Sequence, residues 1–353
     1  MINSHYIPQF ILRHFLNTEK IQYCDLKNKK VESRNTKSVF SEKEYYPEYL
    51  ERELCRHVES QFANLLNNKL AVSKYKFSLS PDEMFILKKY LMITVLRYRS
   101  SELDPDQVIT ADKGLLYAKR LNIKPDIILG DFYDNIYKIL QCSKREDAFK
   151  YISFGAKDSN IQLFAYVRDI FNSYTVAVKT NNCKEDFIIP DSGWAGYSGT
   201  IHIKKLNAVL DLAIKTNDPM LFQIAQMITP HDYSVFPITR NMAIINMSAF
   251  FKLCTKGSPY HIIFSEEAPN ISSALGFGSS EIIEPPKIKP IGRMQNEYTI
   301  EIKQLSTQDV CFLNSLLFSN CNNYFAFSDI SKIQNTIENM KGSTIDLSFL
   351  NNQ

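Results

Sequence analysis

The chain has 353 residues, of which 44% are hydrophobic and 12% aromatic, and its 41 basic and 38 acidic side chains leave a formal net charge of +3. That length is enough for about two domains of ordinary size, and the apolar fraction excludes a disordered chain. Because the charges nearly balance, composition indicates neither a nucleic acid nor an anionic membrane as a partner.

The cysteines and the apolar stretches bear on where the protein resides. Seven cysteines are scattered along the chain without a Cys-x-x-Cys pair, so neither a disulfide framework nor a zinc knuckle fits them. The N-terminal residues lack the basic and apolar regions of a signal peptide. The most apolar stretch, residues 84–98, carries Lys88, Lys89 and Arg97 and is too charged to span a bilayer. We therefore expect a cytoplasmic protein with no membrane as partner.

Apolar periodicity predicts mainly helices in the first half of the chain. Pro8 can occupy the first position of a helix, and the apolar residues after it predict one over residues 8–16. Residues 21–25 and 30–40 predict a small β meander. A helix over residues 47–70 is predicted by an apolar stripe whose members are Leu50, Leu54, Val58, Phe62 and Leu65.

A second long helix is predicted to begin at the sequence Ser-Pro-Asp-Glu, residues 80–83, because this is the pattern of a capping box. Its body, residues 84–98, is apolar on nearly every face, which is typical of a central, buried helix. Helical patterns continue to about residue 172.

After residue 172 the pattern changes to short strands and helices. Strands are predicted at residues 174–178, 186–189, 235–238, 243–246 and 324–327, with a sharp loop at 190–196. Helices are predicted over residues 307–318 and in a segment that ends at Gly342.

These elements predict an α+β fold in which a helical N-terminal half packs on a C-terminal mixed sheet-and-helix half. The expected units are an N-terminal motif with the small β meander at 1–45, a helical region at 46–172 and a mixed α/β region at 173–353. We expect the last two to form one integrated unit.

The chain carries none of the common catalytic signatures. A Gly-x-Gly-x-x-Gly turn after a strand, a P-loop, a His-Glu-x-x-His pair and a Gly-x-Ser-x-Gly elbow are all absent. Candidate functional residues therefore have to be found as polar side chains in apolar surroundings.

Glu59 lies on a partly apolar face of its predicted helix, and Arg97 and Arg99 lie near the end of the apolar helix. A buried carboxylate has to be paired, hydrogen-bonded or protonated. One interpretation is a structural ion pair between packed helices, which burial statistics favour. The other is a polar pocket in which an arginine orients a carboxylate or binds an anionic substrate.

Two further pairs have both an ordinary and a functional interpretation. Glu53 and His57 are one helical turn apart and could bind a metal, although such pairs are common on solvated faces. His5 and Gln9 flank the start of the first predicted helix, where a histidine could donate to a phosphate or act as acid or base.

Asp191 follows a predicted strand and precedes Ser192 and Gly193. Active-site carboxylates often lie in short loops at strand ends. Asp-Ser-Gly is also ordinary turn chemistry, and the turn is the favoured interpretation.

Residues 5–15, His-Tyr-Ile-Pro-Gln-Phe-Ile-Leu-Arg-His-Phe, resemble the opening His-Tyr-Val-Pro-Gln-Phe-Tyr-Leu-Arg-Arg-Phe of a bacterial family known as domain of unknown function 4238. Looser likenesses follow in the same order over most of the chain, at residues 53–59, 96–99, 187–193, 236–239 and 310–328.

The resemblance implies that one constellation is drawn from distant segments, namely His5, Gln9, Glu59, Arg97 or Arg99, Asp191 and Asn314. It supplies no activity. The chain departs from the family pattern at two places, because Ser-Gly at 192–193 replaces Asn-Pro and Thr-Arg at 239–240 replaces Ser-Pro.

The first hypothesis is a hydrolase, in its narrower form a nuclease, that acts on a phosphate-containing substrate such as a nucleotide or nucleic acid. His5, Glu59 and Asp191 would be catalytic, and the two carboxylates would activate water or bind a divalent metal. The residues that would hold the substrate are Gln9, Arg97, Arg99 and Asn314.

The second hypothesis is a non-catalytic sensing or protein-interaction module, in which the same polar residues form a structural network. A third, nucleic-acid binding without chemistry, would need a basic face. The nearest approach to one is Lys27, Lys29 and Lys30, a run that is usually a solvated loop.

Overall fold

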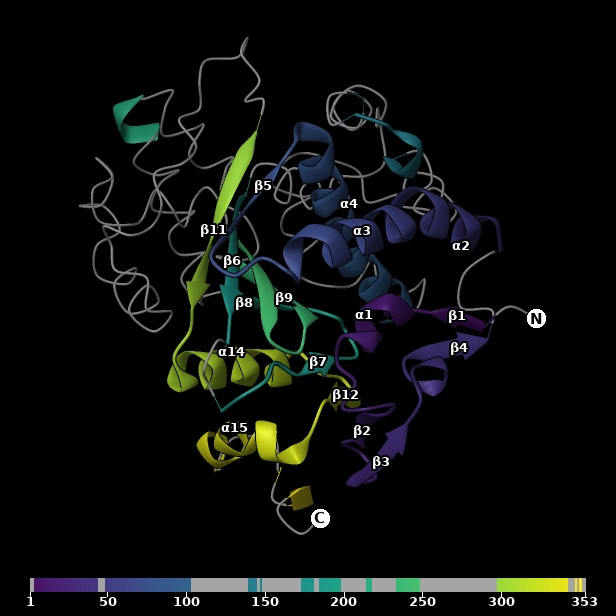
Figure 1. Cartoon of the computed structure of the whole chain (residues 1–353), viewed down its shortest axis with the longest axis vertical. Coiled ribbons are helices and arrows are strands. Elements are labelled where there is room, and N and C mark those ends of the chain that lie inside the picture. The colour runs from purple at the N-terminus through teal and green to yellow at the C-terminus, as the bar shows by residue number, and fades with distance from the viewer. Residues whose placement is uncertain are drawn as a thin grey trace.

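The structure is a computed structural model that describes residues 3–43, 48–102, 139–144, 147, 173–180, 184–197, 214–217, 233–247, 297–341, 347 and 349–350. These residues form helices and three β-sheets (Figure 1). The predicted α+β class is therefore confirmed. The predicted helical half depends on residues 103–172, most of which lie outside the described part of the chain.

The largest sheet has six strands and mixes parallel and antiparallel pairs. Its order is β5 (Lys76–Leu79), β11 (Tyr298–Gln304), β6 (Tyr174–Lys179), β10 (Met242–Met247), β9 (Tyr233–Thr239) and β8 (Ala195–Tyr197). Every residue of β9 and β10 is buried, which explains why the sequences of these two strands are largely apolar and do not alternate with polar residues.

A four-stranded antiparallel sheet joins the two ends of the chain. Its order is β3 (Lys30–Arg34), β2 (Ile21–Asp25), β12 (Tyr324–Phe327) and β7 (Ile189–Pro190). A two-stranded sheet of β1 (Asn3–His5) and β4 (Ser41–Lys43) lies beside it (Figure 1). The predicted meander is thus a hairpin of β2 and β3 that β12 completes.

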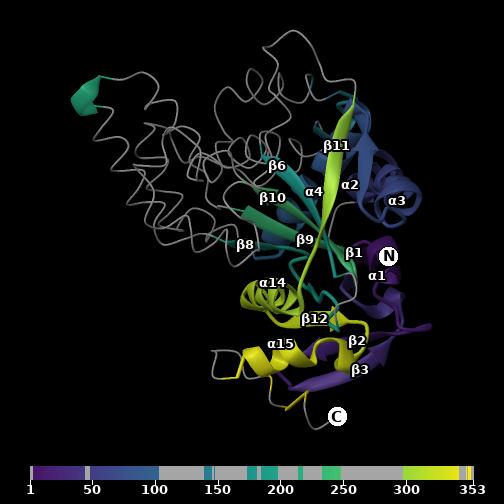
Figure 2. The same cartoon turned by 60° about the vertical axis from the view of Figure 1, so that its left-hand side comes forward.

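The helices lie above and below this framework. A long helix runs through α2 (Glu48–Leu54), the π-helical η2 (Cys55–Glu59), α3 (Ser60–Leu65) and the π-helical η3 (Leu66–Leu70). The others are α1 (Gln9–Arg13), α4 (Pro81–Glu102), α14 (Thr307–Ser319) and α15 (Gln334–Asn339). Figure 2 shows α3 and α4 on one side of the large sheet, with α14 and α15 beyond its end.

Most predicted elements are found close to their expected bounds, and two differ. The strand expected at residues 186–189 is wrong, because residues 185–188 are irregular and β7 holds only Ile189 and Pro190. The loop expected at 190–196 contains the start of β8. Polar contacts to α14 and α15, described below, hold the irregular segment in place of a partner strand.

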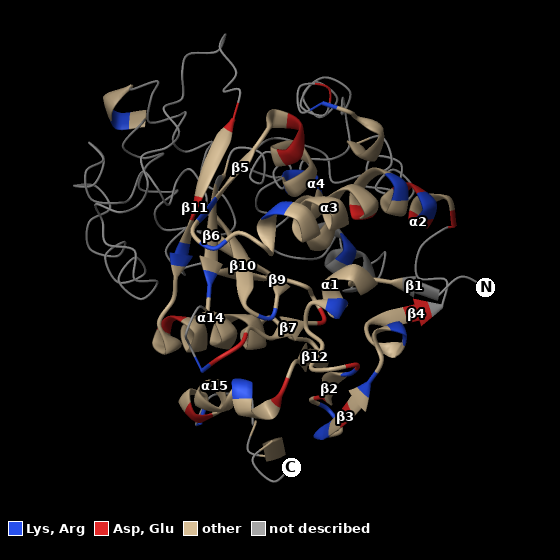
Figure 3. Ribbon diagram, in the orientation of Figure 1, with Lys and Arg blue, Asp and Glu red and all other residues tan. Residues whose placement is uncertain are grey.

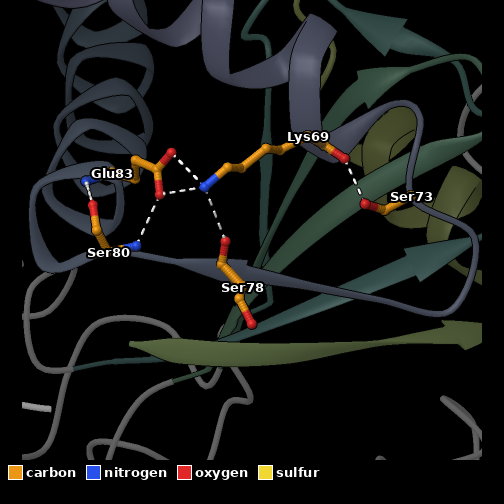
Figure 4. A network of polar contacts seen from close by, with 5 residues as sticks. All are labelled: Lys69, Ser73, Ser78, Ser80 and Glu83. Atoms are coloured by element: carbon orange, nitrogen blue, oxygen red, sulfur yellow. Dashed lines mark hydrogen bonds and ion pairs between the residues drawn. The ribbon is translucent and has the colours of Figure 1, made fainter. Parts of the chain in front are cut away.

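The capping box at the start of α4 is confirmed and forms part of a larger network (Figure 4). The Ser80 hydroxyl accepts from the backbone N–H of Glu83 at 3.2 Å, and the Glu83 carboxylate accepts from the backbone N–H of Ser80 at 2.8 Å. Lys69 donates to Glu83 at 2.7 Å and to the Ser78 carbonyl at 3.3 Å. The network fixes where the chain turns from β5 into α4.

We expect Ser80→Ala to lower the free energy of unfolding by about 1 kcal/mol, because the first turn of α4 loses its side-chain acceptor. Urea denaturation measures the change. Ser33→Ala, at an exposed position of β3, is the matched control and should leave stability unchanged. Equal stabilities of the two variants would contradict a capping role for Ser80.

Candidate functional site

Phe10, an aromatic residue of the N-terminal segment, packs between α3 and α4. Phe10 of α1 lies 6.1 Å from both Phe62 of α3 and Tyr90 of α4, measured between ring centroids. Phe62 and Tyr90 stack on each other at 3.9 Å, with their planes 6° apart. The motif that carries the family resemblance is therefore anchored where the long helix meets α4.

A polar cluster lies next to these rings, and we call His5, Glu51, Glu59 and Arg97 the Arg97 cluster. Arg97 is only 4% exposed and forms an ion pair with Glu59, whose side chain is 19% exposed. Glu51 accepts a hydrogen bond from the backbone N–H of His5. Among the described residues, no hydrogen-bond partner reaches the buried Oε2 atom of Glu51.

The π-helical turn η2 explains how two glutamates eight residues apart can face one arginine. Residues eight apart in a regular α-helix differ by about 80° around the axis, and one extra residue in the turn reduces that offset to about 20°. In η2 the backbone N–H and the hydroxyl of Ser60 both donate to the Cys55 carbonyl. The wide turn therefore aligns Glu59 with Glu51.

The Arg97 cluster perturbs its titratable groups. Burial raises the pKa of Glu51 above its usual value, the Arg97 charge lowers it, and the nearby Glu59 charge raises it. Burial also raises the pKa of Tyr90. A carboxyl group whose pKa is raised by burial, beside a second carboxyl group that forms an ion pair with an arginine, is a pairing typical of general acid and base groups.

Asp191 has its carboxylate turned to the start of β12. The backbone N–H groups of Asn322, Asn323 and Tyr324 donate to it at 2.8–3.0 Å. Burial raises the pKa of Asp191, and these backbone donors lower it. The contacts are those of a residue that organises a turn, and the structure does not bring this carboxylate into contact with the Arg97 cluster.

Gly193 explains one departure from the family pattern. Its φ of +73° lies in the left-handed region, and a Cβ atom there would come within 3.0 Å of the Thr94 methyl group. Proline, whose ring fixes φ near −65°, could not adopt this conformation. The turn after Asp191 therefore passes close to α4 and to Ile7 in a form that the Asn-Pro version cannot take.

Asn314 lies on α14 and is completely buried. Its amide nitrogen donates to the Asp186 carbonyl at 2.9 Å and to the Thr336 hydroxyl at 3.2 Å, and its oxygen accepts from the Ile188 N–H at 3.1 Å. The side chain thus holds the irregular segment before β7 against α14 and α15, and none of these hydrogen bonds reaches the Arg97 cluster.

The remaining predicted residues fall in three places. Gln9 is half-buried at the start of α1. Arg99 is on α4, but its side chain lies outside the described part of the structure. The Nε2 atom of His57 lies 2.9 Å from the Glu53 carboxylate, and both side chains are only partly exposed, so the face that we expected to be solvated is half-buried. Sequence reasoning missed Glu51.

The described residues also bear on metals and membranes. Within them, no group of three His, Cys, Asp or Glu side chains is arranged to hold a metal ion. Nor does any helix in this part of the chain have the length and apolar character required to cross a bilayer.

A comparison with models of protein families gives a match. A family model described as a protein of unknown function (DUF4238) matches residues 3–331, nearly the whole chain. A search of curated proteins found no match, and a search of solved structures found none.

We expect the stability of the protein to depend on the protonation of Glu51. Because its pKa is raised in the folded state, Glu51 stabilises the fold most below its ordinary value of 4.5, and this contribution is lost as the pH rises through the raised pKa. Glu51→Gln should therefore weaken the fall in stability above pH 4.5, as measured by urea unfolding at several pH values. Glu48→Gln, at an exposed position of the same helix, should follow the wild type. Parallel pH profiles for Glu51→Gln and the wild type would contradict the assignment.

Asp191→Ala should destabilise the protein by about 3 kcal/mol, because three backbone N–H groups at the start of β12 lose the carboxylate that accepts from them. Denaturant unfolding measures this loss. Asp25→Ala is the matched control, since Asp25 accepts from the backbone and side chain of Asn28 in an exposed turn. A loss for Asp191→Ala no larger than for Asp25→Ala would argue against a turn-organising role.

Proposed function

The chain belongs to this family of proteins of unknown function, and from its own residues we propose that it is a hydrolase of phosphate esters whose active site is the Arg97 cluster. The observation that carries the proposal is a buried arginine flanked by two carboxyl groups, one of which has an unpartnered oxygen among the described residues. Nuclease activity is the narrower form of the same proposal.

Each group has a role that follows from its surroundings. Arg97 binds the anionic oxygens of the phosphate, because a guanidinium matches two such oxygens at once. Glu59 accepts the proton of the attacking water, and Glu51 gives its proton to the oxygen that leaves phosphorus. Asp191 and Asn314 hold the neighbouring turn and helix, and His5 positions Glu51 through its backbone N–H.

The proposed active site also bears on the predicted division of the chain into regions. The carboxylates and the arginine come from the helical region at 46–172, and the turn with Gly193 that abuts α4 comes from the mixed region at 173–353. A helical N-terminal half packed on the mixed half would thus place the site along their junction.

The second candidate is the non-catalytic sensing or interaction module. It is favoured by the full set of backbone partners around Asp191 and Asn314, because such contacts are sufficient reason for polar residues to be buried. In this case Arg97 and Glu59 join two helices and take no part in chemistry.

Hydrolysis of bis-p-nitrophenyl phosphate and of p-nitrophenyl phosphate, each with Mg²⁺, with Mn²⁺ and with EDTA, tests the proposal. We expect Glu59→Gln to lower the rate by about 10²-fold or more, the usual contribution of a general base. Glu53→Gln, one turn earlier on the same helix and paired with His57, should keep the wild-type rate.

The two candidate functions predict different results in this experiment. A wild-type protein without activity on any of these phosphate esters, or a Glu59→Gln variant with an unchanged rate, would overturn the hydrolase. If Glu59→Gln instead loses about 3 kcal/mol of stability and no activity is found, the buried ion pair is structural, as the second candidate requires.

A further inference from the structure

Lys88 of α4 turns its amino group toward the large sheet and is buried there, with 5% of the residue exposed. The Lys88 Nζ atom donates to the side-chain oxygen of Asn246 in β10 at 2.8 Å and to the carbonyl of Ser173, just before β6, at 2.9 Å. The hydroxyl oxygen of Ser173 lies 3.1 Å from the same nitrogen. Figure 3 shows that α4 is acidic at its first turn and basic farther along the helix.

The strand register adds a fourth polar group beside this lysine. Asn246 pairs with Thr175 of β6, so their side chains share the face of the sheet that Lys88 contacts. The Thr175 hydroxyl oxygen is buried and has no hydrogen-bond partner among the described residues. A buried hydroxyl in this condition is uncommon, because the lost hydrogen bonds to water are not replaced. We call Lys88, Ser173, Asn246 and Thr175 the Lys88 site.

The contacts of the Lys88 nitrogen suit a neutral amine. A carbonyl oxygen and an amide oxygen can only accept, whereas a hydroxyl can also donate. In the amine form, Lys88 gives its two protons to the Ser173 carbonyl and to Asn246, and its lone pair accepts from the Ser173 hydroxyl. A hydroxyl held against a base that a third group orients is the arrangement of an activated nucleophile.

We propose that the Lys88 site is a second active site, which hydrolyses carboxylic esters through an acyl-serine intermediate. Ser173 is half-buried and is the nucleophile, and the buried Lys88 is its base. Asn246, which is 4% exposed, holds the lysine in place. Thr175 donates its unused hydroxyl proton to the carbonyl oxygen of the substrate.

The surroundings of Lys88 favour an apolar acyl group. Phe85 and Met92 lie one helical turn before and after it on the same side of α4, and both are buried. Lys88 and Arg97 are nine residues apart, which places them about 180° from each other around the helix. The Lys88 site therefore shares no residue and no helix face with the Arg97 cluster, and the inference does not depend on the proposed phosphate-ester hydrolysis.

The reaction balances with water as the second reactant. The Ser173 oxygen bonds to the acyl carbon, its proton passes to Lys88, and the alcohol leaves with that proton. Water then attacks the acyl-serine and gives a proton to Lys88, which returns it to the Ser173 oxygen as the carboxylic acid leaves.

Two measurements test the proposal, namely hydrolysis of p-nitrophenyl acetate and butyrate, and labelling by a fluorophosphonate with peptide mass spectrometry. The fluorophosphonate reports an activated serine, because the serine oxygen displaces fluoride from phosphorus. We expect the label on Ser173. Ser173→Ala should abolish that label and lower ester hydrolysis by about 10³-fold or more, the usual contribution of a catalytic nucleophile.

Lys89 provides a matched control for the base. It is the next residue of α4, is 4% exposed, and donates to the Leu140 carbonyl at 3.0 Å. Lys88→Met and Lys89→Met each remove one buried lysine, and only Lys88→Met should lose the label and the activity. Lys88→Arg keeps a donor for Asn246 but cannot act as a base, so it should also be inactive.

Thr175→Val keeps the proposal testable where loss of Lys88 unfolds the protein. It replaces one hydroxyl by a methyl group and should lower ester hydrolysis by about 10²-fold, the usual effect of removing one donor to the oxyanion. Thermal melting of each variant confirms that the protein compared is folded.

Three outcomes would overturn the proposal. They are a folded wild-type protein without label on Ser173, equal ester hydrolysis by the wild type and Ser173→Ala, and a Lys88→Arg variant with the wild-type rate. Ser173→Ala should leave hydrolysis of phosphate esters unchanged, and Glu59→Gln should leave hydrolysis of carboxylic esters unchanged. Failure of one proposed site is therefore observed separately from failure of the other.

Discussion

The long helix at residues 48–70 and α4 run antiparallel, and an ion pair joins them near each end of α4. Glu59 pairs with the buried Arg97, and Lys69 pairs at 2.6 Å with Glu83, the capping residue of α4. The two pairs differ in energy because their exposure differs. The Lys69 side chain is 42% exposed, so solvent screens its attraction, whereas the Arg97 side chain is 4% exposed, and loss of Glu59 would take a carboxylate away from a buried positive charge. The buried pair therefore fixes the register of the two helices most strongly, and the N-terminal motif, the Asp191 turn and the candidate site are all arranged around that register.

In the second half of the molecule, buried neutral and acidic side chains hold segments of the backbone in place through hydrogen bonds. Asn314 holds the irregular segment before β7, and the buried Glu185 accepts from the N–H groups of Asn335 and Thr336 at the start of α15. Asp191 does the same for the start of β12. Segments that lack a ladder partner must find other partners for their N–H groups, and buried polar side chains supply them. The need to pair backbone N–H groups is a sufficient reason for Asn314, Glu185 and Asp191 to be buried, with no role in catalysis required. We therefore confine the proposed active site to the Arg97 cluster.

The parts that could be predicted from the sequence are those whose cause is local. The capping box at Ser80 and Glu83 depends on residues three apart, and the strands β9 and β10 are continuous apolar runs. Glu59 and Arg97 could be identified because each is a charge on an apolar face. Glu51 could not, since its alignment with Glu59 depends on a π-helical turn that ordinary helical spacing does not anticipate.

The two π-helical turns of the long helix carry the two residues that pair with α4, Glu59 and Lys69, in different surroundings. The first ends at Glu59, which pairs with the buried Arg97. The second contains Lys69 and is followed at once by the open turn of Val72 and Tyr75. Ten residues separate Glu59 from Lys69, which is about 15 Å along a helix. The buried pair at Glu59 and the more exposed pair at Lys69 are therefore separate features of one helix, and only the first belongs to the proposed active site.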